Sequence, residues 1–410
     1  MPARRVTRQR APVVPIEFLC YDATMTERLY YTDAYLRTFS ARITDRANDS
    51  RTIYLDRSAF YPTSGGQLFD TGTLAGIAVT DVVDEGDRIA HILAAPAPAG
   101  DTVSGAVDWT RRFDHMQQHT GQHLLSAIFA DRFRLDTVSV HFGATSSTLD
   151  LDTESLSHNT LLAAEEIANA AIAEPRAVTV SFESASSATG LRKPPPRDGE
   201  LRIVTIDALD RSACGGTHVR STAEIGALLI RRTERVRKTT RVEFVCGLRA
   251  VRAARSDHDL VAALAHALAV APAELVATAI VQRDELRAAR SARRELVTAL
   301  DVYHARERFD AATPDANGRR RFLERCSNGS IEELRSLAQA ILALGPALFI
   351  GTIAMPPTIV VASSDAATDA GATLKQVLAD LGGRGGGNAR IAQGTVPDAA
   401  ALDSAVNAFQ

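Results

Sequence analysis

The chain has 410 residues, of which 45% are hydrophobic and 23% are charged, and its formal net charge is −3. This composition is typical of a folded globular protein of about two to four domains, and it argues against a disordered chain. The slightly acidic balance also argues against a protein that coats nucleic acid non-specifically, so contact with nucleic acid would need a local basic patch.

Residues 16–107 are predicted to be rich in β-strands. Short β-branched runs such as RTIYLD (51–56) and RIAHIL (88–93) are separated by Gly, Asp and Pro. Between them, YPTSGGQLFDTG (61–72) is a polar, glycine-rich loop. Its spacing is not that of a phosphate-binding P-loop. A hairpin turn would explain the glycines, but it explains Gln67 less well.

The next segment, DHMQQHTGQHLLSAIF (114–129), has helical spacing of its apolar residues. It holds three histidines four positions apart, His115, His119 and His123. Residues four apart share one face of a helix, so two neighbouring histidines could bind one metal ion. The glutamate of the H-E-x-x-H zinc peptidase motif is missing, which argues against that class. Taken alone, the histidines are also compatible with a purely structural role.

A second pair of candidate ligands, Cys214 and His218, lies in SACGGTHVRS (212–221). The small residues between them let the backbone fold tightly around an ion. Two histidines combined with this Cys and His form an N/S donor set suited to tetrahedral zinc. Both pairs would then belong to one domain and meet in space.

The rest of this central segment is predicted to mix strands and helices. Strands are expected at 139–142 and 147–152, a helix ending at Pro175, further strands at 175–184 and 201–207, and a hairpin at 224–247. The prolines of GLRKPPPRDGE (190–200) predict a loop. The basic run RRTERVRKTTR (231–241) is either a solvated strand face or a nucleic-acid contact.

The C-terminal third begins with two helices that Pro272 divides, the second covering roughly 273–308 with mixed charges on its polar face. A spacer or an oligomer contact would have this pattern. The uncharged stretch 336–364 is broken by Gly and Pro, so we expect a helix and two buried strands there and no membrane span. The last part contains GGRGGGNARIAQG (382–394).

The four scattered cysteines are too few for a disulfide framework. The N-terminus has no apolar signal-peptide core. We therefore expect a reducing compartment, the cytoplasm.

Together, YPTSGGQLFDTG, DHMQQHTGQHLL and CGGTHV strongly resemble the editing portion of alanyl-tRNA synthetase, and in particular the free-standing alanyl-tRNA editing proteins. GGRGGGNARIAQG resembles the C-terminal DHHA1-type domain of the longer members. The resemblance covers nearly the whole chain from about residue 16. A complete synthetase is not expected, because too few residues precede the SGGQ loop.

The resemblance implies an α+β multidomain fold. Its parts would be a β-barrel domain with the SGGQ loop (16–107), a zinc-binding editing domain with an HxxxH helix and a CxxxH loop (108–250), a helical linker or coiled coil (251–310) and a DHHA1-like C-terminal domain (311–410).

For function, the resemblance implies an ATP-independent trans-editing hydrolase that protects translation fidelity. Such proteins cleave the ester that joins serine, and in some members glycine, to tRNA(Ala). The zinc ligands would be His119, His123, Cys214 and His218.

Further roles follow from the same resemblance. A threonine on the strand after the HxxxH helix would recognise the serine hydroxyl, with Thr137 the best match and Ser139 the fallback. Gln67 and Thr63 would lie at the same cleft. Arg384 and Arg390 would contact tRNA, and the C-terminal half could also form a homodimer. His115 is expected at the surface or beside the ligands rather than as a ligand.

Two questions stay open at this level. Four protein ligands are typical of a structural zinc site, whereas catalytic sites keep a position open. The ion could therefore activate water or only position the substrate. The alternative function is a catalytically inactive, zinc-stabilised tRNA-binding or synthetase accessory protein.

Overall fold

The computed structural model describes residues 25–195, 197–365 and 368–409, which form two compact units, one up to Ala262 and one from Ala263. The first unit contains both the predicted barrel and the predicted ligand pairs. Residues 16–24 of the predicted barrel segment, including Cys20, lie outside the described residues.

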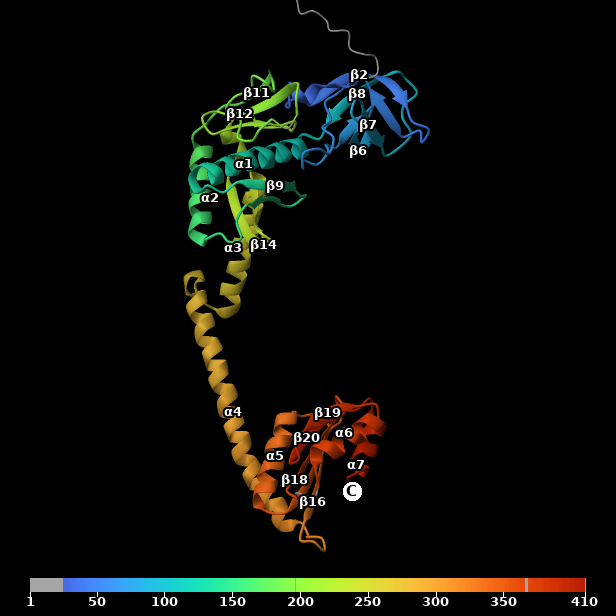
Figure 1. Cartoon of the computed structure of the whole chain (residues 1–410), viewed down its shortest axis with the longest axis vertical. Coiled ribbons are helices and arrows are strands. Elements are labelled where there is room, and N and C mark those ends of the chain that lie inside the picture. The colour runs from blue at the N-terminus through green and yellow to red at the C-terminus, as the bar shows by residue number, and fades with distance from the viewer. Residues whose placement is uncertain (1–24, 196, 366–367, 410) are drawn as a thin grey trace, which may run out of the picture. The chain divides into compact units, whose positions relative to one another are not determined.

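The first unit begins with a closed barrel of six strands, which confirms the predicted β-barrel (Figure 1). Its strands are β2 (Thr38–Arg46), β3 (Thr52–Leu55), β5 (Gly72–Leu74), β6 (Ile77–Asp84), β7 (Ile89–Leu93) and β8 (Thr102–Val107). The short strands β1 (Glu27–Arg28) and β4 (Arg57–Ser58) pair in parallel beside it, next to a 3-10 helix at Leu29–Tyr31. Alternate residues of β2 and β8 point inward, which gives the barrel its own apolar core.

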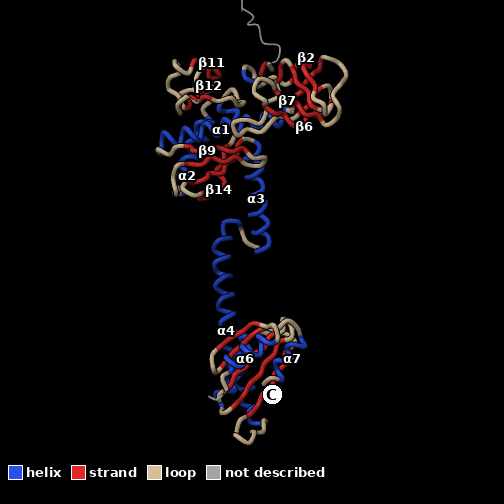
Figure 2. Tube along the Cα trace, turned by 45° about the vertical axis from the view of Figure 1, so that its right-hand side comes forward, coloured by secondary structure: helices blue, strands red, loops and turns tan. Residues whose placement is uncertain are grey.

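The rest of the first unit places helix α1 (Trp109–Phe133) between two sheets (Figures 1 and 2). One is antiparallel, with the order β14-β15-β10-β9, and the other has the order β11-β12-β13. The bounds are β9 (Thr137–Phe142), β10 (Ser147–Leu151), α2 (His158–Ala173), β11 (Val178–Ser184), β12 (Glu200–Ile206), β13 (Asp210–Ala213), a 3-10 helix (Thr222–Ile225), β14 (Leu228–Val236) and β15 (Thr239–Cys246). A second apolar core joins α1, α2 and the four-stranded sheet.

The predicted helical pair is present as α3 (Leu248–Leu268) and α4 (Leu275–Ala311), with a short 3-10 helix at Pro272–Glu274 between them. Both helices are largely exposed, and α4 becomes buried only near its end, at Ala305 and Phe309. In the described part of the chain, no single helix is long and apolar enough to cross a membrane, and only α3 and α4 taken as a bent pair meet that criterion.

The second unit is built on a five-stranded sheet with the order β16-β17-β18-β20-β19 (Figure 2). Its elements are β16 (Arg320–Cys326), α5 (Ile331–Leu344), β17 (Ala347–Ile353), β18 (Thr358–Ser363), α6 (Ala370–Asp380), β19 (Arg384–Gly387), β20 (Ile391–Thr395) and α7 (Ala399–Asn407). Helices α4 and α5 pack on one face of the sheet, and α6 and α7 pack on the other. The buried strands β17 and β18 were predicted, whereas β16 was not.

Candidate metal centre and its polar network

Helix α1 carries the His-x-x-x-His pair through the interior of the first unit. Asp108 caps its start by accepting a hydrogen bond from the Arg111 backbone, and Arg134 ends it in a left-handed conformation. Because α1 lies between two sheets, its middle is buried on all sides. His119 and His123 are each only 4% exposed, so their polar ring atoms need partners within the protein.

The second pair of candidate ligands lies in the loop that follows β13. Gly216 in this loop packs directly against the His119 ring, and a Cβ atom added there would lie 2.1 Å from its Cε1. Only glycine allows this approach, which gives the glycine in CGGTH a physical reason. The loop thereby places Cys214 and His218 against the helix.

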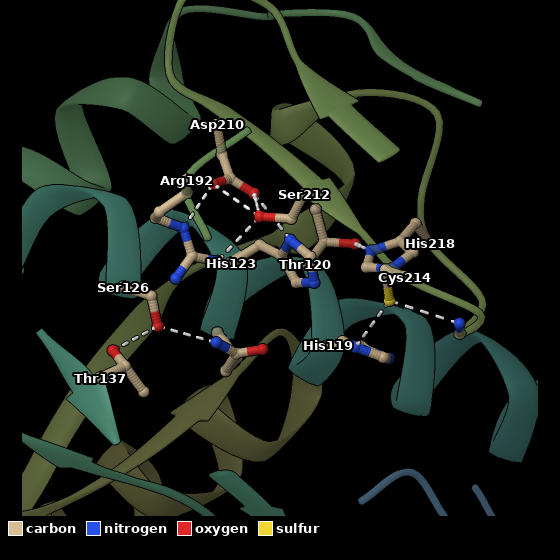
Figure 3. A network of polar contacts seen from close by, with 12 residues as sticks. His119, Thr120, His123, Ser126, Thr137, Arg192, Asp210, Ser212, Cys214 and His218 are labelled. Carbon is tan, nitrogen blue, oxygen red and sulfur yellow. Dashed lines mark hydrogen bonds and ion pairs between the residues drawn. The ribbon is translucent and has the colours of Figure 1, made fainter. Parts of the chain in front are cut away.

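Four donor atoms converge at this point. One ligand atom each from His119, His123, Cys214 and His218 lies within 4.8 Å of the others. The Cys214 Sγ lies 3.4 Å from His119 Nε2 and 3.3 Å from His218 Nε2 (Figure 3). Three imidazoles and a thiol are donors that zinc and similar ions prefer, and the cluster could hold such an ion.

Each histidine of the cluster has a separate partner at its Nδ1. The partners are Gln67 Oε1 for His119 (2.9 Å), Asp210 Oδ2 for His123 (2.8 Å) and Thr120 Oγ1 for His218 (3.1 Å). The Thr120 hydroxyl donates to the Met116 carbonyl, so it accepts from His218. Protons held at Nδ1 leave the lone pair of each Nε2 for a metal ion, which is the usual second layer of a metal site.

The Asp210 carboxylate belongs to this network, and the sequence analysis did not predict it. It also accepts hydrogen bonds from Arg192 Nε at 2.6 Å and from the Ser212 hydroxyl (Figure 3). Burial would raise the pKa of Asp210, but the hydrogen bond from His123 and the Arg192 charge lower the pKa to about 2. The one hint in the sequence was that Asp210 lies four residues before Cys214, close enough to belong to the same site.

Charge inside the cluster favours a thiolate at Cys214. Burial alone would raise the pKa of this thiol, but the neighbouring His119 and His218 lower it well below its usual value. Burial would likewise lower the pKa of His123, yet the hydrogen bond to Asp210 and the Cys214 sulfur raise it to about 9. A negative sulfur among imidazoles is the electrostatic arrangement that a divalent cation stabilises.

Gln67 is drawn into this network from the barrel. Besides accepting from His119, its Oε1 accepts from the Thr217 backbone at 3.2 Å, and its Nε2 donates to the Thr217 hydroxyl at 2.8 Å. The side chain is 1% exposed. Both ends of the amide are therefore occupied in positioning His119 and the CGGTH loop.

Thr63, which was expected at the same cleft, is exposed, and its hydroxyl accepts a hydrogen bond from the Phe69 backbone within its own loop.

Thr137 starts β9 and is 6% exposed. Its hydroxyl donates to Ser126 Oγ at 2.8 Å, and Gln122 Nε2 donates to the same oxygen at 2.7 Å. Figure 3 shows Thr137 and Ser126 beside the helix that carries His119 and His123. Ser139, the fallback, donates instead to Asp150 at 2.6 Å.

His115 lies outside the cluster of four donors, in agreement with the prediction. It is 5% exposed, which excludes the surface position among the two that were expected, and its Nδ1 has no hydrogen-bond partner among the described residues. The face of helix α1 that carries His115 lies near β15 and the start of α3. The spacing of the histidines in the sequence did not predict these neighbours.

The basic run 231–241 forms the β14–β15 hairpin, and acids neutralise most of it. Arg231 pairs with Asp257, Arg232 with Glu243, Arg235 with Glu154 and Arg241 with Asp150. This favours the solvated strand face over a nucleic-acid contact.

Arg384 and Arg390 are exposed, the first on β19 and the second in the turn before β20. The glycines around them have a packing role. A Cβ atom at Gly385 would lie 2.4 Å from the Gln393 carbonyl oxygen and 2.5 Å from Leu378. Close packing of α6 on this strand pair thus explains part of the glycine run without RNA.

Comparisons with known proteins bear on the same regions. A family model described as the threonyl and alanyl tRNA synthetase second additional domain matches residues 201–242, which include the CGGTH loop. The alanyl-tRNA editing protein AlaX-M of Methanosarcina acetivorans is 34% identical over 238 residues, 53% of this chain and 97% of that protein.

Two longer relatives match as well. The alanyl-tRNA editing protein AlaX-L of Pyrococcus horikoshii is 36% identical over 55% of this chain and 59% of its own length. The alanine–tRNA ligase of Pyrococcus furiosus is 31% identical over 96% of this chain and 44% of its own length. The chain thus spans about half the length of these two relatives.

Proposed function

The chain belongs to the family of alanyl-tRNA editing proteins, and on that basis we propose that it is a deacylase that removes serine wrongly attached to tRNA(Ala). Glycine is the second substrate to test. The observation that carries the proposal is the cluster of three imidazoles and one thiol whose outer nitrogens are all held by partners. The reaction is hydrolysis of the ester at the terminal adenosine.

The donors His119, His123, Cys214 and His218 would hold a zinc ion. When bound, zinc supplies Lewis-acid chemistry suited to ester hydrolysis, through a polarised carbonyl or a more acidic water. Cys214 is the one donor of the four that is not fully buried, and it lines a cavity of about 530 Å³. Cys214 is therefore the donor of the cluster nearest to solvent.

Thr137 would discriminate serine from alanine. Because its proton is donated to Ser126, its oxygen lone pairs remain available to accept a hydrogen bond from the hydroxyl of a seryl group. An alanyl group has no hydroxyl, so its binding would leave the lone pairs of this buried oxygen without a donor. Sites of this kind reject the analogue that lacks the hydroxyl strongly.

Gln67 is proposed to act through His119 rather than on the substrate, because both ends of its amide are already used. Arg384 and Arg390 are proposed tRNA contacts, since both are exposed cations beside a glycine-rich strand. Thr63 and Ser139 have local partners, and neither is needed in this scheme.

A deacylation assay tests the proposal. Ser-tRNA(Ala), Gly-tRNA(Ala) and Ala-tRNA(Ala) are incubated with the wild type, with Cys214→Ala and with Cys326→Ala. We expect rapid release of serine, retention of alanine, and loss of both bound metal and activity in Cys214→Ala. Cys326 is a partly buried cysteine outside the cluster and is the matched control, with wild-type metal content and activity.

The proposal is wrong if the wild type releases no amino acid, or if folded, metal-free Cys214→Ala is fully active. The closed set of four protein donors favours one alternative, a zinc-stabilised protein that binds tRNA without hydrolysing the ester. Binding of tRNA(Ala) with no release of serine would favour that alternative.

A further inference from the structure

The buried His115 imidazole lines a cavity that is separate from the candidate metal centre, because none of the four donor residues lines it. The cavity has a volume of about 790 Å³ and lies along the first turns of α1, facing the β9–β10 turn, β15 and the start of α3. This volume is typical of sites for small molecules. The His115 ring forms part of the cavity wall, and its Nδ1, which has no hydrogen-bond partner among the described residues, is enclosed behind that wall.

Aromatic rings form part of the cavity wall. Trp109 and Phe113 line it, with ring centroids 5.4 Å apart and planes tilted by 34°. The Arg37 guanidinium lies over the Trp109 ring at 4.1 Å, and Tyr35 packs against it. The indole is thus fixed in place and remains partly exposed. A fixed, partly exposed aromatic surface is what nucleic-acid bases stack on.

The charges at the cavity are unevenly paired. Among its lining residues, Arg231 and Arg249 have carboxylate partners, Asp257 and Asp114. In the described part of the chain, Arg111 and Arg252 have no ion-pair partner. The Arg111 Nε donates to the Phe69 carbonyl, and the guanidinium lies over the Phe69 ring, 5.3 Å from its centroid. Arg252 is exposed.

The remaining acids at the cavity are already engaged. Glu243 pairs with Arg232, and Asp108 caps α1 and accepts from Thr71. Two guanidinium groups without a carboxylate partner among the described residues, beside an aromatic surface, suit a ligand with both a phosphate and a flat ring, because arginine binds phosphate through paired N–H groups.

From these observations we infer that the cavity is a second nucleotide-binding site, which takes one nucleotide of a single RNA strand. The base stacks on Trp109 and Phe113, its phosphate contacts Arg111 and Arg252, and its base edge or ribose hydroxyl contacts the part of the His115 ring that lines the cavity. The site would hold a nucleotide of the substrate RNA away from the ester. This inference rests on the proposed function for the identity of that RNA.

Trp109 provides the assay, because it is the single tryptophan of the chain. Its fluorescence is followed in the full-length protein during titration with adenosine 5′-monophosphate, adenosine, inorganic phosphate and a short single-stranded RNA that ends in adenosine. We expect saturable quenching by the monophosphate and the RNA, with the RNA binding at least tenfold more tightly. Adenosine should bind about tenfold more weakly than the monophosphate, and phosphate alone should compete without quenching.

The key variant is Arg252→Ala, matched by Arg255→Ala one turn further along α3. Both arginines are exposed, but only Arg252 lines the cavity. Arg252→Ala should weaken binding of the RNA about tenfold and raise the KM for aminoacylated tRNA several-fold without changing kcat. Arg255→Ala should match the wild type. His115→Leu should weaken binding about tenfold while metal content stays normal.

Absence of saturable quenching, or equal effects of Arg252→Ala and Arg255→Ala, would overturn the inference. Quenching by the free monophosphate but not by RNA would also overturn it, because the site would then serve a free nucleotide. If the wild type deacylates tRNA but shows none of this binding, the second site fails and the proposed function stands. If RNA binding depends on Arg252 but no ester is cleaved, the site stands and the proposed function fails.

Discussion

The His123 ring donates its Nδ1–H to Asp210 Oδ2 over 2.8 Å, and Asp210 is held in turn by Arg192. This contact fixes the tautomer that directs the Nε2 lone pair of His123 toward the other three donors. Removing such a partner typically lowers metal affinity by about 10- to 100-fold. We therefore expect Asp210→Asn to lose zinc affinity by that factor, measured by competition with a chromogenic chelator.

The control for this variant is Asp207→Asn, which changes an exposed carboxylate in the turn before β13. It should bind zinc as the wild type does. If Asp210→Asn kept wild-type affinity, the carboxylate would have only a structural role.

Replacement of Gln67 separates positioning from catalysis. Because the Gln67 amide contacts His119 and Thr217, Gln67→Ala should lower zinc affinity and deacylation together, and added zinc should restore much of the activity. Metal content and kcat are measured over a range of zinc concentrations. Full zinc occupancy with no activity would instead mean that Gln67 acts on the substrate directly.

The pair of Thr137 and Ser126 governs the expected discrimination. Thr137→Val removes the accepting oxygen while preserving shape, so the ratio of kcat/KM for seryl over alanyl ester should fall by about 10- to 100-fold. Ser126→Ala keeps the Thr137 oxygen but removes the acceptor of its proton, so the hydroxyl is no longer held in one orientation. The same ratio should therefore fall by a smaller factor. An unchanged ratio in Thr137→Val would remove Thr137 from this role.

The buried ion pair of Arg112 and Asp70 holds the barrel against α1. Both side chains are 0% exposed, with Arg112 Nε 2.9 Å from Asp70 Oδ2. Asp70→Asn leaves a buried guanidinium without its counter-charge and should cost about 3–5 kcal/mol of unfolding free energy. Urea unfolding followed by Trp109 fluorescence measures this change.

The exposed pair of Arg235 and Glu154 offers the matched comparison. Glu154→Gln should change the unfolding free energy by less than about 1 kcal/mol. Similar losses in Asp70→Asn and Glu154→Gln would contradict the claim that burial makes the first pair important.

The barrel should lose stability as the pH falls from about 6.5 to 4. His91 is fully buried with its Nε2 2.7 Å from Ser58 Oγ, and burial lowers its pKa to about 4. The unfolded chain, with a pKa near 6.5, takes up a proton in this window while the folded chain does not. The contribution of His91 to the unfolding free energy is therefore fully present above pH 6.5. At pH 4 the unfolding free energy is lower by at most about 3 kcal/mol because of this residue.

Urea midpoints at pH 7 and pH 5 measure the effect. His91→Gln should show a smaller difference between the two pH values than the wild type, whatever its stability at pH 7. The comparison cancels the contribution of His115, whose pKa burial and the Arg111 charge also lower to about 4. An equal pH dependence in both proteins would contradict the prediction.

Local sequence patterns predicted much of the first unit because the contacts involved are local. The i, i+4 spacing of His119 and His123 and the short loop of CGGTH place each pair of ligands without knowledge of the fold. Asp210 and Arg192 were not predicted, because their contacts depend on how β13 and a loop fold onto α1. The partners His123 and Asp210 are 87 positions apart.

Two other misses have similar physical reasons. Strand β16 reads RRFLERC, and charged residues make this edge strand resemble a polar loop. The unpartnered nitrogen of His115 became apparent only after β15 and α3 were in place, since burial depends on elements distant in sequence. The spacing of the three histidines carries no information about this packing of β15 and α3.

The hydrogen bond between Gln67 and Thr217 joins residues 150 positions apart. Together with the contact of Arg112 and Asp70, it makes the barrel part of the candidate metal centre rather than a detachable module. A truncated protein that starts at Trp109 would keep all four donors but lose the partner of His119. Exchange of barrels between relatives should therefore succeed only when the SGGQ loop and the CGGTH loop are transferred together.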